Sequence, residues 1–416
     1  WYIHSFRETM LAYAALVRYR QSERAAESGR RAVRRMARVC ADPRKADFHP
    51  TLQPYNTSHP VYFHGRAIEG LLRFYQATGD EAALELAGRL AAYHLENMTR
   101  EDGSLGEDPG NHTHSYLNTL RGLLLYGQLT RQRRYIDTVY TTYKNAVAKR
   151  ITPAGFIYHD MDISGFAVGE VASAGDVAQL ALWLYHDTHD PELLDDVERI
   201  VRSRLLPSQI DQTPRLVPME TSDGDDLRAL SRRIVGALGG VAGHTWGKSC
   251  VTDITAATLH SLIDVAHHIT EKNETGIWVQ LHFDCTTPYV RIESTRADDA
   301  RLAIHVPGEE DLFVRIPGWA PIDSVKLVVD GKQAPIRRHG TYLFVPGSSC
   351  GLQVEIRYDL PRRTTKETSR MRYYQTPDRA HGPAQDPIVY TLRWRGDEVV
   401  SASPVGDFFP IYPLQP

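Results

Sequence analysis

The feature that most restricts the fold is a helix–turn–helix pattern that occurs three times in the first half of the chain. Each copy ends a predicted helix at a threonine, makes a short polar turn and begins the next helix. These threonines, Thr78, Thr130 and Thr188, are 52 and 58 residues apart. A period near 50 residues indicates stacked helical hairpins, each burying its apolar face on its neighbours. About five or six hairpins fit into the first ~270 residues, which favours a closed α/α toroid with loops around a central cleft.

The hydrophobic period changes from helical spacing to alternation after Glu274, which is typical of strands. Asp330-Gly331 is a strong signal for a two-residue hairpin turn. We therefore predict a fold that is mainly α plus β, with an α/α-barrel catalytic domain at 1–272 and a β-sandwich domain at 273–416. From about residue 365 we expect an extended C-terminal arm. The strands are expected at 277–283, 289–293, 302–306, 312–316, 325–329, 342–345 and 352–356.

Charge and composition limit the partners of the chain. The formal net charge of −3 over 416 residues lacks the basic footprint of a nucleic-acid-binding protein. No apolar run reaches the ~18 residues that a membrane span needs. The four cysteines are far apart in the sequence, which suits a reducing compartment. With no basic-then-apolar leader in the sequence, we expect a cytoplasmic protein without nucleic-acid or membrane partners, in an oligomeric state that the sequence leaves open.

A candidate catalytic loop runs from Tyr158 to Glu170. It places Asp160, Asp162 and Glu170 within thirteen residues, just before a strongly patterned helix. We expect Glu170 in the first turn of that helix, where the helix dipole favours a carboxylate. Paired carboxylates can serve as general acid and base. The alternative interpretation is a helix cap at Glu170 with two solvated turn residues.

Three further loops carry unusual polar residues, and each precedes a predicted helix. His64 and Arg66 begin one helix, His112 and His114 begin another, and His244 with Trp246 begins the last long one. In a toroid these loops would meet at the cleft. Histidines and aromatic rings beside carboxylates suit a sugar, because rings stack on its apolar faces while polar groups bind its hydroxyls. Tyr158 joins this substrate-binding set. Any single histidine among them could instead be a satisfied structural residue.

Two other interpretations involve metal or thiol chemistry. His112 and His114 could chelate a metal, although no helical HxxxH or cysteine pair supports such a site. Cys250 stands at a predicted helix start beside Lys248, where a thiolate would be favoured. A lone cysteine is more commonly a small buried hydrophobe.

The chain resembles the β-L-arabinofuranosidase family, glycoside hydrolase family 127. The resemblance implies an (α/α)6 barrel with a β-sandwich and a retaining glycosidase. The segments that carry it are 59–80, 169–176, 196–209, 250–252, 314–320 and 393–400.

The resemblance also implies a zinc site built from a Glu-x-Cys and a Cys-Cys pair, one cysteine being the nucleophile. Glu170 and Cys250 match this pattern, whereas Ala172 and Val251 replace the other two ligands. Because structural zinc uses four ligands, we expect no cofactor, with zinc through Glu170 and Cys250 as the alternative. The family's acid/base glutamate has no clear counterpart, and Asp160 or Asp162 is nearest in position.

The sequence thus predicts a glycoside hydrolase that acts on a plant- or microbe-derived glycan or glycoside, with a β-L-arabinofuranoside-like substrate as the candidate that the resemblance implies. Glu170 with Asp160 or Asp162 is the predicted carboxylate pair, and Cys250 is a candidate nucleophile. One alternative is a polysaccharide lyase or sugar epimerase that uses Tyr158 with His112 and His114. The other is a sugar-binding relative without activity.

Overall fold

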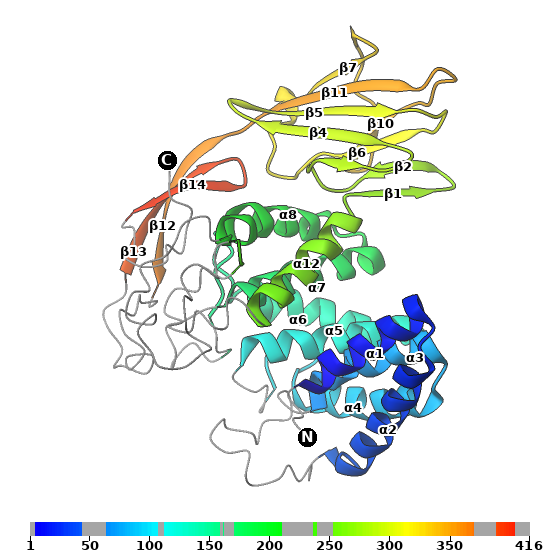
Figure 1. The fold of residues 1–416 in the computed structure, drawn as a ribbon. Helices are drawn as coiled ribbons and strands as arrows, with labels where there is room; N and C mark the ends of the chain where they lie inside the picture. The colour runs from blue at the N-terminus through cyan, green and yellow to red at the C-terminus, as the bar shows by residue number, and fades with distance from the viewer. Residues whose placement is uncertain are drawn as a thin grey trace. The chain divides into compact units, whose positions relative to one another are not determined.

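The structure is a computed structural model that describes residues 5–43, 64–106, 112–158, 161, 170–209, 236–238, 253–369 and 388–403. The chain divides into two compact units. The first comprises residues 1–151 and 157–166, and the second comprises residues 152–156 and 167–416. Figure 1 shows both units, and each is described here by itself.

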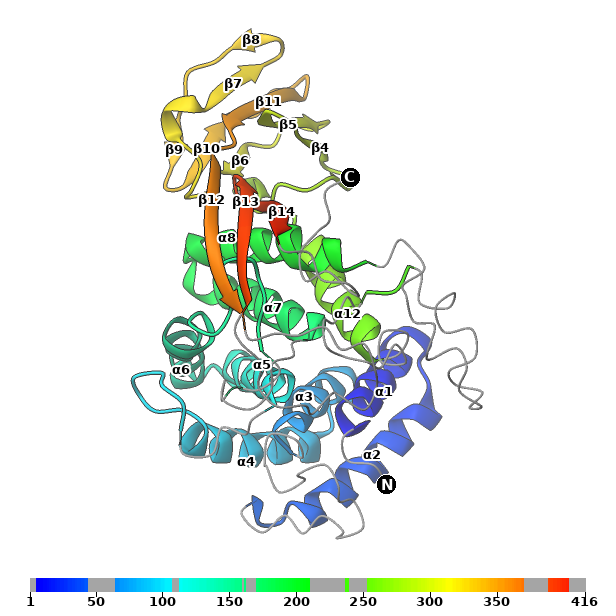
Figure 2. The same cartoon turned by 90° about the vertical axis from the view of Figure 1, so that its left-hand side faces the viewer.

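The first unit consists of helical hairpins. The short α3 packs against both α1 and α5, and most of its side chains are buried. The helices α2, α4 and α6 each pair with the preceding odd-numbered helix (Figure 2). Such a repeating contact pattern gives every hairpin a neighbour on which to bury its apolar face. The helices are α1 (Phe6–Arg20), α2 (Glu23–Val39), α3 (Ala67–Thr78), α4 (Glu81–Asn97), α5 (Thr113–Thr130) and α6 (Arg133–Thr142), which continues as η5 (Tyr143–Val147).

The corners of the hairpins confirm the sequence repeat. α3, α5 and α7 end at Thr78, Thr130 and Thr188, and each threonine hydroxyl donates to the carbonyl four residues earlier. The next residue adopts the left-handed conformation, with φ of 69° at Gly79 and 54° at His189. This conformation terminates a helix because it directs the chain away from the helix axis. The corner is therefore encoded locally.

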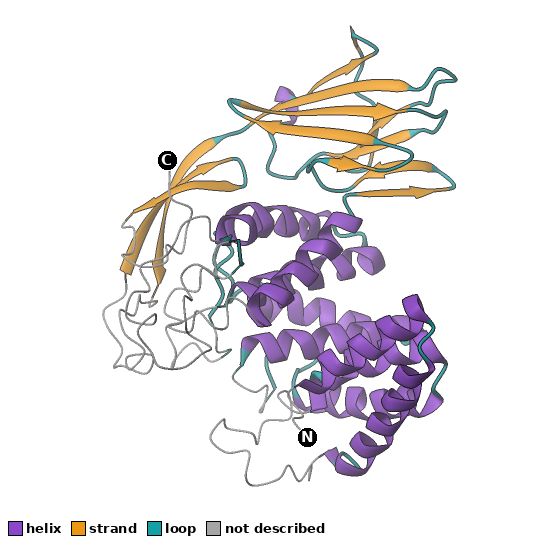
Figure 3. Cartoon of the chain, in the orientation of Figure 1, coloured by secondary structure: helices purple, strands orange, loops and turns teal. Residues whose placement is uncertain are grey.

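The second unit begins with helices and continues into sheets. Its helices are α7 (Val171–Thr188), α8 (Pro191–Ile200), η6 (Val201–Leu205), η7 (Leu206–Ser208) and α12 (Asp253–His267). α7 packs against both α8 and α12, and all its residues from Val171 to Tyr185 are buried. α12 ends at His267 and β1 begins at Thr270, so strands follow the last helix after two residues. Figure 3 shows this order of helices and strands.

Two sheets form the predicted β-sandwich. One has the order β1-β2-β6-β10-β9 and the other the order β3-β4-β5-β11-β7-β8. All pairings are antiparallel except β2 with β6. Alternate residues of β11 are buried, as period-two alternation requires. The strands are β1 (Thr270–Asn273), β2 (Gly276–Val279), β3 (Cys285–Thr286), β4 (Arg291–Arg296), β5 (Asp299–Val306), β6 (Leu312–Arg315), β7 (Lys326–Val329), β8 (Lys332–Gln333), β9 (Arg338–His339), β10 (Tyr342–Val345) and β11 (Leu352–Asp359).

One turn and one segment of the β half test the sequence predictions directly. Asp330 and Gly331 both have positive φ and join β7 to β8, which confirms the predicted hairpin. The extended C-terminal arm is wrong over the described residues. β12 (Arg362–Ser369), β13 (Ile388–Arg395) and β14 (Glu398–Ser403) pair antiparallel in a separate three-stranded sheet. Backbone hydrogen bonds therefore hold these strands in a sheet with β13 at its centre, whereas the sequence pattern predicted one extended segment.

The fold class, mainly α plus β with helical hairpins before a β-sandwich, is confirmed by these elements. Within the described part of the chain, no helix combines the length and the apolar character needed to span a bilayer.

Candidate active site

Polar side chains gather where α1, α3 and α5 begin. Two of the predicted residues, Arg66 and His114, both act on Glu8 in the first turn of α1. Arg66 Nη2 lies 2.9 Å from Glu8 Oε1, and His114 contributes to the electrostatic potential at the same carboxylate. The structure thereby links a carboxylate at the start of α1 with a guanidinium at the start of α3, and an imidazole at the start of α5 acts on the same carboxylate electrostatically. A common substrate site for the predicted loop clusters stays a prediction.

Glu8 is held in its charged form. Burial opposes the charge, but Arg66 and Arg7 outweigh it, and the pKa of Glu8 is lower than that of a free glutamate. Its side chain is 46% exposed, so it can accept a hydrogen bond from a ligand. An ionised carboxylate is an acceptor only. Glu8 can therefore bind a hydroxyl group but is poorly suited to act as a general acid near neutral pH.

A cluster of buried ion pairs around Glu69 holds Arg7, the residue that precedes Glu8 in the chain. Glu69 on α3 accepts from Arg7 Nε at 2.9 Å and from Arg121 Nη2 at 3.3 Å. The three side chains are 1% to 5% exposed. Two guanidinium groups on one buried carboxylate compensate its desolvation and fix its position. The sequence analysis missed Glu8 and this cluster. Their signal was present as charged residues, Glu69 and Arg121, among apolar neighbours in two strongly buried helices.

His112 and His114 stand at the N-terminus of α5. His112 is the residue before the helix, and its Nδ1 lies 2.7 Å from Ser115 Oγ. His114 Nδ1 lies 3.2 Å from Asn118 Nδ2. The two rings meet edge to face with centroids 6.0 Å apart. Because both Nδ1 atoms are engaged within α5, a metal chelated through that pair of atoms is excluded. Among the residues that the structure describes, no group of three His, Cys, Asp or Glu side chains could hold a metal ion.

His64 is a structural residue in this geometry, in place of the predicted contact with substrate. It is fully buried. Its Nε2 lies 3.2 Å from the Pro43 carbonyl, and its Nδ1 lies 2.9 Å from His94 Nε2. Burial lowers the pKa of His64 to about 4, so the ring is neutral near pH 7. Both nitrogens are thus used in joining α3 to α4 and to the end of α2.

The remaining predicted site residues lie outside the cluster around Glu8 or outside the described part of the chain. Tyr158 belongs to the first unit and is partly exposed. Glu170 belongs to the second unit, where it is the N-cap residue of α7, one position before the predicted first turn. Its side chain makes no capping hydrogen bond to α7. The predicted residues that lie outside the described part of the chain are Asp160, Asp162, His244, Trp246 and Cys250.

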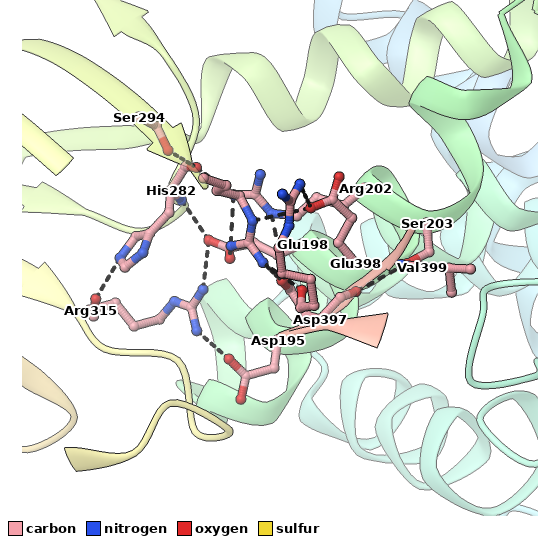
Figure 4. A network of polar contacts seen from close by, with 12 residues as sticks. Asp195, Glu198, Arg202, Ser203, His282, Ser294, Arg315, Asp397, Glu398 and Val399 are labelled. Atoms are coloured by element: carbon pink, nitrogen blue, oxygen red, sulfur yellow. Dashed lines mark hydrogen bonds and ion pairs between the residues drawn. The ribbon is translucent and has the colours of Figure 1, made fainter. Parts of the chain in front are cut away.

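A second polar cluster lies within the second unit, between α8 and the strands (Figure 4). At its centre, Arg315 on β6 contacts Glu198 on α8 with Nη2 2.8 Å from Oε1, and also pairs with Asp195. The backbone N–H of His282 donates to the same Glu198 oxygen at 2.5 Å. Burial opposes the charge of Glu198, but Arg315 and His282 outweigh it and the pKa of Glu198 falls well below its usual value.

The cluster extends to the three-stranded sheet through Asp397 at the β13–β14 turn. Arg296 Nη2 lies 2.5 Å from Asp397 Oδ1, and Arg202 Nε lies 3.6 Å from Oδ2. Ser203 Oγ donates to the Asp397 carbonyl and accepts from the Val399 N–H. Glu198, Arg315 and Asp397 are at most 2% exposed. Because the central charges are buried and paired with one another, this cluster joins helix to strand as part of the packed interior.

A family model matches the first part of the chain. Residues 4–152 match the model of the β-L-arabinofuranosidase family, GH127 catalytic domain. This segment contains the whole cluster around Glu8. The family resemblance is confirmed. The chain is a glycosidase, and its substrate is a carbohydrate. No curated protein matches it.

Solved structures resemble the chain over nearly its full length. A structure described as a glycoside hydrolase has a TM-score of 0.60 at 13% identity, over 95% of this chain and 68% of that one. A GH127 β-L-arabinofuranosidase from Geobacillus stearothermophilus T6 has a TM-score of 0.48 at 14% identity, over 96% of this chain and 77% of that one. At these identities the first likeness concerns the fold alone.

Proposed function

We propose that the chain hydrolyses glycosides of the β-L-arabinofuranoside type, with the sugar bound at the starts of α1, α3 and α5. The family match over residues 4–152 supports this proposal most directly, because the cluster around Glu8 lies inside the matched segment. Ionised Glu8 would accept from a sugar hydroxyl, while Arg66 and His114 would donate to others. This mixture of donors and acceptors suits a polyhydroxylated ligand.

The proposed chemistry uses carboxylates. The sequence offers Glu170, Asp160 and Asp162 as candidates, one protonated as general acid and another ionised. A separation of ~5 Å would make the enzyme retaining, and ~6.5–9.5 Å would make it inverting. Cys250 is the alternative nucleophile, which would attack the anomeric carbon as a thiolate while the acid protonates the leaving oxygen.

The family resemblance implies zinc, and the residues of this chain fit it poorly. Of the four positions that would supply ligands, two carry Ala172 and Val251. Ala172 is buried in the first turn of α7 and offers no donor atom. Two surviving ligands are too few for a structural zinc site. We therefore propose catalysis without zinc.

The test measures hydrolysis of a panel of aryl glycosides by wild type, Glu170→Gln and Cys250→Ser, with and without a chelator. We expect wild type to cleave an arabinofuranoside and the chelator to leave the rate unchanged. Carboxylate chemistry predicts a loss of at least about a hundredfold in kcat for Glu170→Gln and little change for Cys250→Ser.

Other outcomes assign the chemistry differently. Loss of activity only in Cys250→Ser would establish the cysteine mechanism. Loss with the chelator, together with zinc found in the purified protein, would contradict zinc-free catalysis. Binding of arabinose without cleavage of any glycoside would favour a sugar-binding protein without activity. The loss of a zinc ligand at Ala172 is consistent with that alternative.

A further inference from the structure

We propose that Asn118 is a positioning residue that holds His114 in one tautomer, with its proton on Nε2. In this form the ring is a hydrogen-bond donor toward ligand and not an acceptor. The tautomer follows from hydrogen-bonding logic within the first unit. Its use in binding a sugar hydroxyl rests on the proposed function.

The first step is the orientation of the Asn118 side-chain amide. Its oxygen Oδ1 lies 2.5 Å from Arg121 Nη2, and its nitrogen Nδ2 lies 2.6 Å from the His114 carbonyl oxygen. A guanidinium can only donate, and a carbonyl oxygen can only accept. If the amide were flipped, its NH2 group would face the Arg121 guanidinium, donor against donor, and its oxygen would face the His114 carbonyl, acceptor against acceptor. Both contacts therefore assign the same orientation to the amide.

The second step is the tautomer of His114. Asn118 Nδ2 carries two hydrogens, one directed to the His114 carbonyl and the other available for His114 Nδ1 at 3.2 Å. Since Nδ2 cannot accept, Nδ1 must accept. A neutral imidazole has one donor nitrogen and one acceptor nitrogen. The proton of the neutral ring must therefore be on Nε2.

The third step is what keeps Arg121 in place. Arg121 is 1% exposed, and its Nη2 lies 3.3 Å from Glu69 Oε2. Arg7 Nη2 lies 2.8 Å from the same oxygen. A buried carboxylate shared by two guanidinium groups has little freedom to rearrange, because breaking either contact would leave a buried charge poorly compensated. The order Glu69, Arg121, Asn118, His114 is thus a chain of contacts that begins in the core and ends at the site.

His112 shows why the inference concerns His114 alone. Its Nδ1 contacts Ser115 Oγ, and a hydroxyl group can both donate and accept. The contact therefore leaves the tautomer of His112 open. An amide oriented at both ends removes that freedom for His114.

The ligand chemistry follows from the neighbours. His114 with a protonated Nε2 donates, and ionised Glu8 nearby accepts. A donor and an acceptor that interact electrostatically match the hydroxyl groups of a sugar. In this tautomer Nδ1 accepts from the Asn118 amide and Nε2 carries the proton, so neither ring nitrogen offers a lone pair to a metal.

The test records the ring nitrogens of His114 by long-range ¹H–¹⁵N NMR on protein with ¹⁵N-labelled histidine, at a pH where its histidines are neutral. His114→Gln assigns the signals. We expect wild type to show Nε2 protonated and Nδ1 unprotonated. Asn118→Asp has nearly the same shape but only acceptor atoms, so we expect the proton to move to Nδ1 or both nitrogens to be protonated. Asn145→Asp is the matched control, since the Asn145 amide donates to the Asp102 carbonyl instead.

Two results would overturn the proposal, namely Nδ1 protonated in wild type or an unchanged Nε2 tautomer in Asn118→Asp. Asn118→Ala, which should give a mixture of tautomers, replaces Asn118→Asp if the latter does not fold. For the sugar contact we expect KM for an arabinofuranoside to rise roughly five- to tenfold in Asn118→Asp, with kcat changed less. Unchanged KM with a switched tautomer would refute the sugar contact alone. An inactive wild type would refute the proposed function and leave the tautomer to be decided by NMR.

Discussion

Arg315 is the side chain on which the second polar cluster most depends. It is fully buried, pairs with Glu198 and Asp195, and donates from Nε to the Gln280 carbonyl at 2.6 Å. Arg315→Met keeps much of the volume but leaves Glu198 as a buried carboxylate whose nearest guanidinium is Arg202 at 3.9 Å, with the His282 N–H as a further donor. Removing one partner of a buried ion pair typically costs about 3–5 kcal/mol. We expect a loss of this size in the free energy of unfolding, measured with urea.

The control at the residue scale is Arg301→Met. Arg301 also pairs with a carboxylate, Glu355 Oε2 at 2.7 Å, but its side chain is 35% exposed on β5. Surface pairs contribute about 0–1 kcal/mol. Equal losses in the two variants would contradict the importance given to burial. In Arg315→Met with Glu198→Gln, part of the loss should be recovered because the unpaired charge is gone.

At the element scale, capping side chains at the hairpin corners stabilise the helices that begin there. Asp80 precedes α4, and its Oδ1 accepts from the Ala82 N–H at 3.0 Å. It also accepts from the Ala83 N–H at 3.4 Å, so without the carboxylate two N–H groups of the first helical turn lose their side-chain partner. We expect Asp80→Ala to lower the free energy of unfolding by about 1 kcal/mol. Asp137→Ala, which removes an exposed pair with Arg133, should cost about 0.3–0.5 kcal/mol. A smaller loss in Asp80→Ala than in Asp137→Ala would contradict the capping role.

Elements set by neighbours in sequence were predictable, and those set by distant partners were not. Thr78 and Asp330 act within a few residues of themselves, so the corners and the β7–β8 turn follow from local pattern. The segment that contains β12 was predicted to be an extended arm. Its partner β13 begins 19 residues after β12 ends, and an alternating pattern in one segment does not show which distant segment pairs with it.

The same reason explains the candidate site. The starts of α3 and α5 were predicted from their histidines, which are local features. Glu8 was missed because its importance comes from Arg66, 58 residues away. The tautomer of His114 could not be predicted because Arg121 reaches Glu69 across 52 residues.

At the scale of the whole molecule, both units contain a buried neutral histidine. Burial lowers the pKa of His64 in the first unit and of His282 in the second to about 4. Unfolding returns each ring to water, where its pKa is near 6.5. Between these two values the unfolded chain binds more protons than the folded chain. Stability is therefore highest above pH 6.5 and falls as the pH is lowered toward 4.

We expect the free energy of unfolding to fall between pH 7 and pH 5 by about 2 kcal/mol for each of these two histidines. Urea unfolding at a series of pH values measures the slope, and fluorescence and far-ultraviolet circular dichroism would show whether the two units unfold together. His64→Gln should reduce the slope by one histidine's share even if it lowers stability at every pH. His305→Gln, at an exposed position on β5, should leave the slope unchanged. A slope that is equal in wild type and His64→Gln would mean that the His64 ring is charged in the folded chain, and its contacts with Pro43 and His94 would then have to be reassigned.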